Sequence, residues 1–299
     1  MNPYVEAARP RTLPAALAPV VVGTAAASRG VAELDLVRAG LALVVAVSLQ
    51  VAVNYANDYF DGVRGIDTEA RVGPRRAVAA GLVTPRAMRA AMVVALLVAG
   101  GAGLALAALA GWELLLVGVA AILATLTYSG GPKPYASAAL GEAMVFVFFG
   151  VVATAGSAYV QDERLTVLPL LASLPMGAFA VALLVVNNLR DIPTDRAVGK
   201  RTLAVILGEG RTRATFGLLI AGAYLSLAPI GLVAGSPWIV LPAVSVLRAR
   251  RALEVVRDAP LGRELIAALG MTSRTQVSFA ALLTIGLLLS QTTVSGGAS

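Results

Sequence analysis

Two short segments rich in Asp and Asn contain the residues whose types and spacing could support catalysis. In the first segment, Asn54, Asp58 and Asp61 are spaced i, i+4 and i+7, so on a helix they share one face. In the second segment, Asp191 and Asp195 are spaced i and i+4 and share a face in the same way. Neighbouring carboxylates repel one another unless a cation lies between them, and all-oxygen ligands favour Mg²⁺. These four Asp residues are therefore the predicted metal-binding and catalytic groups.

A second interpretation of the same segments involves no metal. Each segment lies where an apolar stretch of sequence ends, and Asp or Asn side chains at such a helix end can simply be hydrated. Metal binding is the favoured interpretation because two separate helix ends carry matched acids and amides, whereas hydration would require no such match.

Basic residues follow each acidic segment, which favours a phosphorylated ligand. The cations are Arg64, Arg75 and Arg76 after the first segment and Arg196, Lys200 and Arg201 after the second. Mg²⁺ and basic side chains together can hold the oxygens of a diphosphate group. The alternative is that these residues only follow the preference for positive charge in cytoplasmic loops.

Lys133 is a different case, because it is the one cation in its predicted loop. Gly130 and Gly131 precede it, and Tyr128 and Tyr135 flank it. Glycine allows tight backbone turns and tyrosine supplies hydroxyl groups. The composition of this loop predicts a role for Lys133 in the site.

The rest of the composition indicates that a lipid bilayer surrounds these segments. Of 299 residues, 58% are hydrophobic and only 14% are charged, and the mean hydropathy is +0.81. A membrane-spanning helix needs about 20 apolar residues. We therefore predict an all-α polytopic membrane protein, formed by residues 1–299 as one domain, with about nine transmembrane helices. The apolar runs are residues 13–28, 36–56, 87–110, 112–128, 138–160, 166–186, 214–234, 237–246 and 277–294.

The distribution of basic residues predicts the orientation in the cell membrane. If the nine runs alternate in direction, only Arg29, Arg38 and Arg164 fall on one side, and the other 21 of the 24 Lys and Arg residues fall on the opposite side. Basic loops are cytoplasmic, so we expect a cytoplasmic N-terminus, an external C-terminus and acidic segments at the cytoplasmic face. The net charge of +7 then indicates contact with anionic lipid or an anionic substrate, and not with nucleic acid.

The chain contains no Cys and no His. This excludes thiolate nucleophiles, disulfides, zinc sites built on those residues and any imidazole base. Chemistry must depend on carboxylates, amides, hydroxyls, Arg, Lys and bound metal.

Several of these motifs together resemble the UbiA-type intramembrane prenyltransferases, and most closely the branch that prenylates 1,4-dihydroxy-2-naphthoate in menaquinone synthesis. The resemblance extends over nearly the whole chain. It rests on the residues at 9–14, 57–61, 71–75, 130–135 and 187–195. One departure concerns the third acid of the first motif. The wider superfamily has that acid four residues after the second, where this chain has Gly65, and the acid here is Asp67.

The resemblance implies a fold, a reaction and a set of binding residues. The fold would be nine helices around a central cavity, with capping loops on the cytoplasmic side. The reaction would join a polyprenyl diphosphate to an aromatic acid, releasing diphosphate and carbon dioxide. Asn57 and Asp67 would join the four Asp residues as Mg²⁺ ligands. The substrate-binding residues would be Arg11, Asn54, Arg64, Arg75, Tyr128, Lys133, Tyr135, Asn187, Asn188, Arg190, Lys200 and Arg201.

Two other functions remain open from the sequence. A prenyltransferase of the same family could accept 4-hydroxybenzoate or a chlorophyll-type acceptor instead. An ion-coupled transporter would also carry acids within its membrane helices. The transporter is less favoured because both acidic segments lie at one edge of the predicted bilayer and not at its midplane.

Overall fold

The computed structural model describes residues 2–28, 33–65 and 76–295, with side chains to residue 291, and this part of the chain is helical. The described part contains no strand, only an isolated parallel bridge between Ala138 and Arg201. The elements are α1 Pro3–Ala7, η1 Pro10–Thr12, α2 Pro14–Ala25, α3 Leu36–Val63, α4 Pro85–Ala110, α5 Leu114–Ser129, η3 Tyr135–Ser137, α6 Gly141–Val145, η4 Phe146–Val152, α7 Ala153–Asp162, α8 Val167–Ala197, α9 Leu203–Leu225, α10 Leu227–Ala234, η5 Pro237–Ser245, α11 Val246–Asp258 and α12 Leu265–Ser295. The prediction of an all-α fold is confirmed for these residues.

Six helical segments of the described chain are long and apolar enough to cross a bilayer: α3, α4, α6 to α7, α8, α9 to α10, and α12. Two shorter apolar helices, α2 and α5, correspond to two further predicted runs. The remaining predicted run, residues 237–246, is the 3₁₀ segment η5, which continues into α11. The chain is therefore a multi-pass membrane protein, whereas the count of nine spans stays a prediction.

Two segments that lie between the predicted apolar runs are largely helical. Helix α8 continues to Ala197, through Pro193, and α9 begins at Leu203 with a break at Gly208, whose φ is 75°. Residues 246–258 form α11, which buries Ala249, Ala252 and Val256. Periodic small and apolar residues stabilise a helix even where Arg residues line its other face, and a search for apolar runs alone misses such helices.

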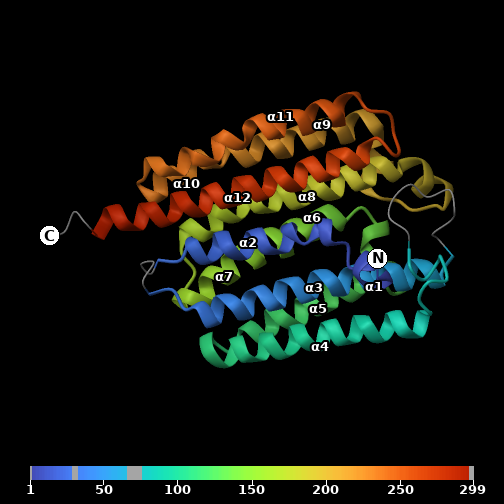
Figure 1. Cartoon of the computed structure of the whole chain (residues 1–299), viewed down its shortest axis with the longest axis horizontal. Coiled ribbons are helices and arrows are strands. Elements are labelled where there is room, and N and C mark those ends of the chain that lie inside the picture. The colour runs from blue at the N-terminus through green and yellow to red at the C-terminus, as the bar shows by residue number, and fades with distance from the viewer. Residues whose placement is uncertain (1, 29–32, 66–75, 296–299) are drawn as a thin grey trace.

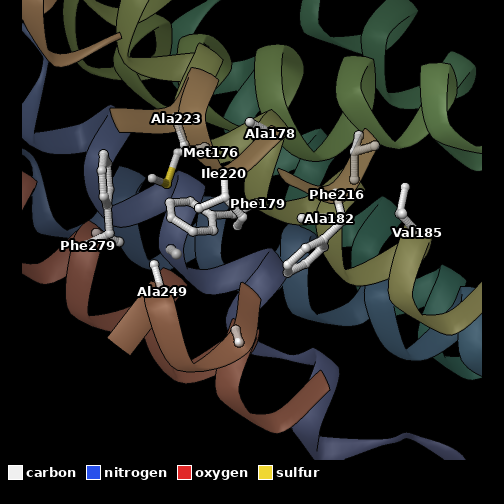
Figure 2. Close-up of a cluster of buried hydrophobic side chains, with 14 of the residues drawn as sticks. Met176, Ala178, Phe179, Ala182, Val185, Phe216, Ile220, Ala223, Ala249 and Phe279 are labelled. Atoms are coloured by element: carbon white, nitrogen blue, oxygen red, sulfur yellow. The ribbon is translucent and has the colours of Figure 1, made fainter. Parts of the chain in front are cut away.

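Helix α8 lies at the centre of the bundle. In its most apolar stretch 78% of the residues are buried, compared with 17% for α3. Figure 2 shows Phe179 of α8 beside Phe279, Ile220 and Ala249, which belong to α12, α9 and α11. The rings of Phe179 and Phe279 meet edge to face, with centroids 5.1 Å apart.

Glycine allows α8 and its neighbours to approach closely. A Cβ atom at Gly150 would lie 2.6 Å from the Cα of Gly177 on α8, so neither position has room for a side chain. Gly150 lies in η4, a π-helical turn between α6 and α7. Small residues at helix contacts are typical of membrane bundles, where close packing replaces the hydrophobic effect.

The acidic segments lie at one end of this bundle. Figure 1 shows the C-terminal ends of α3 and α8 at the end of the molecule that also holds α1, while α12 ends at the opposite end. Both helices run past the predicted spans by several residues and so carry the acidic motifs within regular helix.

Candidate functional site

The last turns of α3 carry the first acidic motif on a buried face. Asn54, Asn57, Asp58 and Asp61 are all buried, and the predicted shared face of Asn54, Asp58 and Asp61 therefore points into the protein. Buried charged groups at a helix end are costly unless other groups compensate them. Hydration of an exposed helix end therefore does not describe these four side chains.

Asp58 accepts hydrogen bonds from the backbone of the segment between α3 and α4. Its two carboxylate oxygens accept hydrogen bonds from the N–H groups of Ala77, at 2.9 Å, and Val78, at 2.8 Å. Gly62, one turn further along α3, leaves room for this segment, because a Cβ there would lie 2.7 Å from Val78 Cγ1. The first motif thus holds the turn that begins at Ala77 against the C-terminal end of α3.

Asp61 lies between two cations that come from different parts of the sequence. Its Oδ2 is 3.5 Å from Arg76 Nη2 and 3.3 Å from Lys200 Nζ. Lys200 lies in the short connection between α8 and α9. The predicted association of acids and cations is therefore present, and Lys200 joins the end of the second motif to the first.

Asn57 and Arg64 connect α3 to the loop that contains Lys133. The Asn57 side-chain oxygen accepts a hydrogen bond from the Ser129 hydroxyl. Arg64 donates to the carbonyl oxygens of Ser129, at 2.7 Å, and Gly131. A Cβ at Gly130 would lie 2.7 Å from the Phe60 ring, so this loop can pass α3 only with glycine at that position.

The second motif extends along the last turns of α8. Arg190 donates two hydrogen bonds to Asp191, at 2.7 and 2.6 Å, and both side chains are largely buried. Asn188 Nδ2 donates to Glu142 Oε1 at 2.9 Å. Asn187 and Asp195 are partly buried on the same helix.

Tyr128 belongs to the last turn of α5 and lies close to the start of α6, since a Cβ at Gly141 would lie 4.0 Å from its ring. Its ring meets that of Tyr135 edge to face, with centroids 5.3 Å apart. Tyr135 in turn donates to the Ala124 carbonyl, and burial, together with Tyr128, raises the pKa of the Tyr135 phenol.

The N-terminal segment packs over the same end of the bundle. Asn54 donates to the carbonyl of Ala8, at 2.9 Å, and to Thr12 Oγ1, at 3.2 Å. Arg9 adopts a left-handed backbone with φ of 52°. The Asn54 amide therefore positions the segment that precedes α2.

Some of the predicted site residues contact one another at this end of the bundle, and others do not. Asn54, Asn57, Asp58, Asp61, Arg64, Tyr128, Asn188, Arg190, Asp191 and Lys200 take part in the contacts given above. The side chains of Arg11, Lys133 and Arg201 are exposed. Asp67 and Arg75 lie outside the described residues.

The acidic residues fit a hard metal ion by donor chemistry, because they offer only carboxylate and amide oxygens. In the described ranges, no group of three or more acidic side chains is close enough to share one ion. A hollow of about 460 Å³ lies elsewhere, between α9 and α11, and Arg213 and Arg250 are among the residues that line it. The central cavity therefore stays a prediction.

Glu142 and Ser129 contact predicted site residues but are not among them. Glu142 is the one acid in the apolar run 138–160, and an ionisable residue within such a run is itself a signal of function. The Ser129 hydroxyl carries no comparable signal, because serine is common at helix ends.

Known proteins show the same combination of sequence and fold. A sequence profile of the UbiA prenyltransferase family matches residues 16–264. The chain belongs to the UbiA prenyltransferase family. It is 47% identical, over 88% of its length and 89% of the relative, to a Mycobacterium tuberculosis protein named 1,4-dihydroxy-2-naphthoate octaprenyltransferase. An Escherichia coli protein of the same name is 40% identical, over 75% of both chains.

Solved members of the UbiA family have the same fold. The apo structure of a UbiA homologue from Aeropyrum pernix K1 aligns with a TM-score of 0.68 at 17% identity, over 93% of this chain and 97% of that chain. A UbiA homologue from Archaeoglobus fulgidus bound to DMAPP and Mg²⁺ aligns with a TM-score of 0.64 at 16% identity, over 94% and 99% of the two chains. Identities this low show the common fold alone.

Proposed function

We propose that this chain transfers a polyprenyl group from a polyprenyl diphosphate to 1,4-dihydroxy-2-naphthoate. Diphosphate and carbon dioxide are released, and the product is demethylmenaquinol, the reduced form of demethylmenaquinone. The observation that carries this proposal is the 47% identity to the naphthoate octaprenyltransferase over 88% of the chain. The cluster formed by Asp61, Arg76 and Lys200 supports it, because a diphosphate requires cations close to carboxylates that can hold a metal.

The residues of this chain would act mainly on the leaving group. Asn57, Asp58, Asp61, Asp191 and Asp195, with Asp67, would hold Mg²⁺, which neutralises diphosphate charge when bound. Arg76 and Lys200, with Lys133 and Arg75 from the adjoining loops, would bind phosphate oxygens and stabilise the charge that develops as the allylic C–O bond breaks. Tyr128 and Tyr135 would form an aromatic wall beside the acceptor ring.

The proposal includes a topology. Residues 1–299 form one membrane domain with nine spans, a cytoplasmic N-terminus and a site at the cytoplasmic face. Helix α1 and the last turns of α12 lie at opposite ends of the bundle, which supports an odd number of spans (Figure 1). The excess of Lys and Arg in the loops at the site end supports the orientation.

The test is a product assay on the purified protein in lipid vesicles. Polyprenyl diphosphate, Mg²⁺ and one of three acceptors are supplied: 1,4-dihydroxy-2-naphthoate, 4-hydroxybenzoate or a chlorophyll-type acceptor. We expect a prenylated, decarboxylated naphthoate as the main product. If another acceptor is turned over preferentially, that compound and not the naphthoate is the acceptor. The absence of any prenylated product would reject the proposed function.

A further inference from the structure

Glu142 is a buried carboxylate that the chemistry of the leaving group does not use. It is the second residue of α6, at the start of the continuous helical segment Gly141–Asp162, and only 7% of it is exposed. An acid at the first turn of a helix benefits from the helix dipole, but that benefit is available at the surface and does not explain burial. A buried acid within an apolar segment of a membrane protein indicates a functional role.

The partner of Glu142 is an amide and not a cation. Its Oε1 accepts a hydrogen bond of 2.9 Å from Asn188 Nδ2 on α8. Two other buried acids of the site are paired with cations, Asp61 with Lys200 and Asp191 with Arg190, and Asp58 accepts two backbone N–H bonds. Within the described residues Glu142 forms no ion pair, and its Oε2 accepts no hydrogen bond. One carboxylate oxygen therefore remains available to a ligand.

The environment of Glu142 suits an aromatic ring that carries a hydroxyl group. A Cβ at Gly141 would lie 4.0 Å from the ring of Tyr128 and 3.5 Å from Leu184 on α8, so this backbone packs between α5 and α8. Tyr128 and Tyr135 offer two ring faces at right angles to each other. An aromatic ligand would thus find ring contacts and a carboxylate acceptor together.

We propose that Glu142, oriented by Asn188, accepts a hydrogen bond from a ring hydroxyl of the aromatic acceptor and so fixes the position of the ring beside Tyr128. This inference rests on the proposed function, because it assumes a hydroxylated aromatic acceptor. A hydrogen bond from a hydroxyl to a carboxylate is charge-assisted and stronger than one between neutral groups. Glu142 then contributes to acceptor binding, separately from the residues that hold diphosphate.

The direct test replaces Glu142 by Gln, which keeps the shape and removes the charge. We expect the KM for the naphthoate to rise by about ten- to a hundredfold, while the KM for polyprenyl diphosphate stays within about twofold. Glu142→Asp should recover part of the loss. The matched control is Glu113→Gln, because Glu113 precedes α5 at the end opposite Tyr128, about 20 Å away by helix length, and contacts Tyr159. This control should leave both KM values unchanged.

A second measurement does not depend on the folding of a variant. The two monomethyl ethers of the naphthoate are tested as competitive inhibitors of the wild-type enzyme, since methylation removes the hydroxyl donor. At least one ether should bind about ten- to a hundredfold more weakly than the parent acid binds, and Glu142→Gln should abolish that difference. The inference would be overturned if both ethers bound the wild type as tightly as the parent acid does. It would also be overturned if Glu142→Gln left the KM for the naphthoate unchanged, or raised the KM for the naphthoate and the KM for polyprenyl diphosphate equally. Failure of the wild type to prenylate the naphthoate is a different result, since it rejects the proposed function itself.

Discussion

Lys200 Nζ lies 3.3 Å from Asp61 Oδ2 and so joins the connection after α8 to the end of α3. The same oxygen lies 3.5 Å from Arg76 Nη2. One buried carboxylate and two cations together have a net positive charge. That excess suits a diphosphate, because the single carboxylate leaves positive charge that an anion can balance.

Replacing Lys200 by Met tests this charge arrangement, because Met retains an unbranched apolar chain but has no ammonium group. We expect the KM for polyprenyl diphosphate to rise about ten- to a hundredfold, and the KM for the acceptor to change little, since a hydrogen bond to a charged group contributes about 1.5–3 kcal/mol. Steady-state kinetics with each substrate varied in turn measure the effect. Arg257→Met, at an exposed cation on α11, is the control. A wild-type KM for the diphosphate in the Lys200 variant would remove this residue from the site.

Asp58→Asn should lower both activity and stability. Asp58 accepts two backbone N–H bonds, and Asn has only one acceptor oxygen, so one buried N–H group loses its partner. We expect a loss of about 1–3 kcal/mol in the free energy of unfolding and a lower melting temperature.

The control for Asp58 is Asp258→Asn, which removes an exposed carboxylate and should leave the melting temperature unchanged. Both variants are melted in the same detergent, and their turnover is measured alongside. A higher melting temperature for Asp58→Asn would show that repulsion between carboxylates outweighs the two hydrogen bonds.

Lys133→Ala tests whether the exposed lysine of the Gly130–Gly131 loop binds diphosphate. We expect a KM for polyprenyl diphosphate that is about ten- to a hundredfold higher, or a matching fall in kcat. Arg86→Ala removes an exposed cation at the start of α4 and should have no such effect. Identical kinetics for the two variants would mean that Lys133 serves only the charge balance of its loop.

Metal dependence is tested by chelation. Excess EDTA should abolish turnover, and added Mg²⁺ should restore it, because carboxylates and phosphate oxygens both prefer this hard cation. Calorimetry should show weak binding of Mg²⁺ alone and tighter binding when diphosphate is present, because the charges of the metal and the anion neutralise each other. Full turnover in EDTA would exclude a metal requirement.

Topology is tested by reporter fusions at the two termini. A reporter after Ser299 should behave as external and a reporter before Met1 as cytoplasmic, because nine spans place the termini on opposite sides. If both reporters behave as cytoplasmic, the number of spans is even and the count of nine is wrong.

The sequence by itself determined the class of the fold and the chemistry of the motifs. Apolar composition requires a bilayer, and helices are the structures that satisfy backbone hydrogen bonds there. The spacing of Asn54, Asp58 and Asp61 places them on one helix face, and α3 carries them on a buried face. Both inferences depend on local sequence: the first on the length of the apolar runs, and the second on spacing within about two turns of helix.

Only the tertiary structure decided which partners these side chains find. Nothing in the sequence connects Lys200 to Asp61, 139 residues apart, or Asn188 to Glu142, 46 residues apart. Nor does it indicate that Asp58 holds the backbone of Ala77 and Val78. Such contacts depend on how the helices pack, as η4 packs against α8 at Gly150 and Gly177, and packing is a property of side-chain volumes that meet across the bundle.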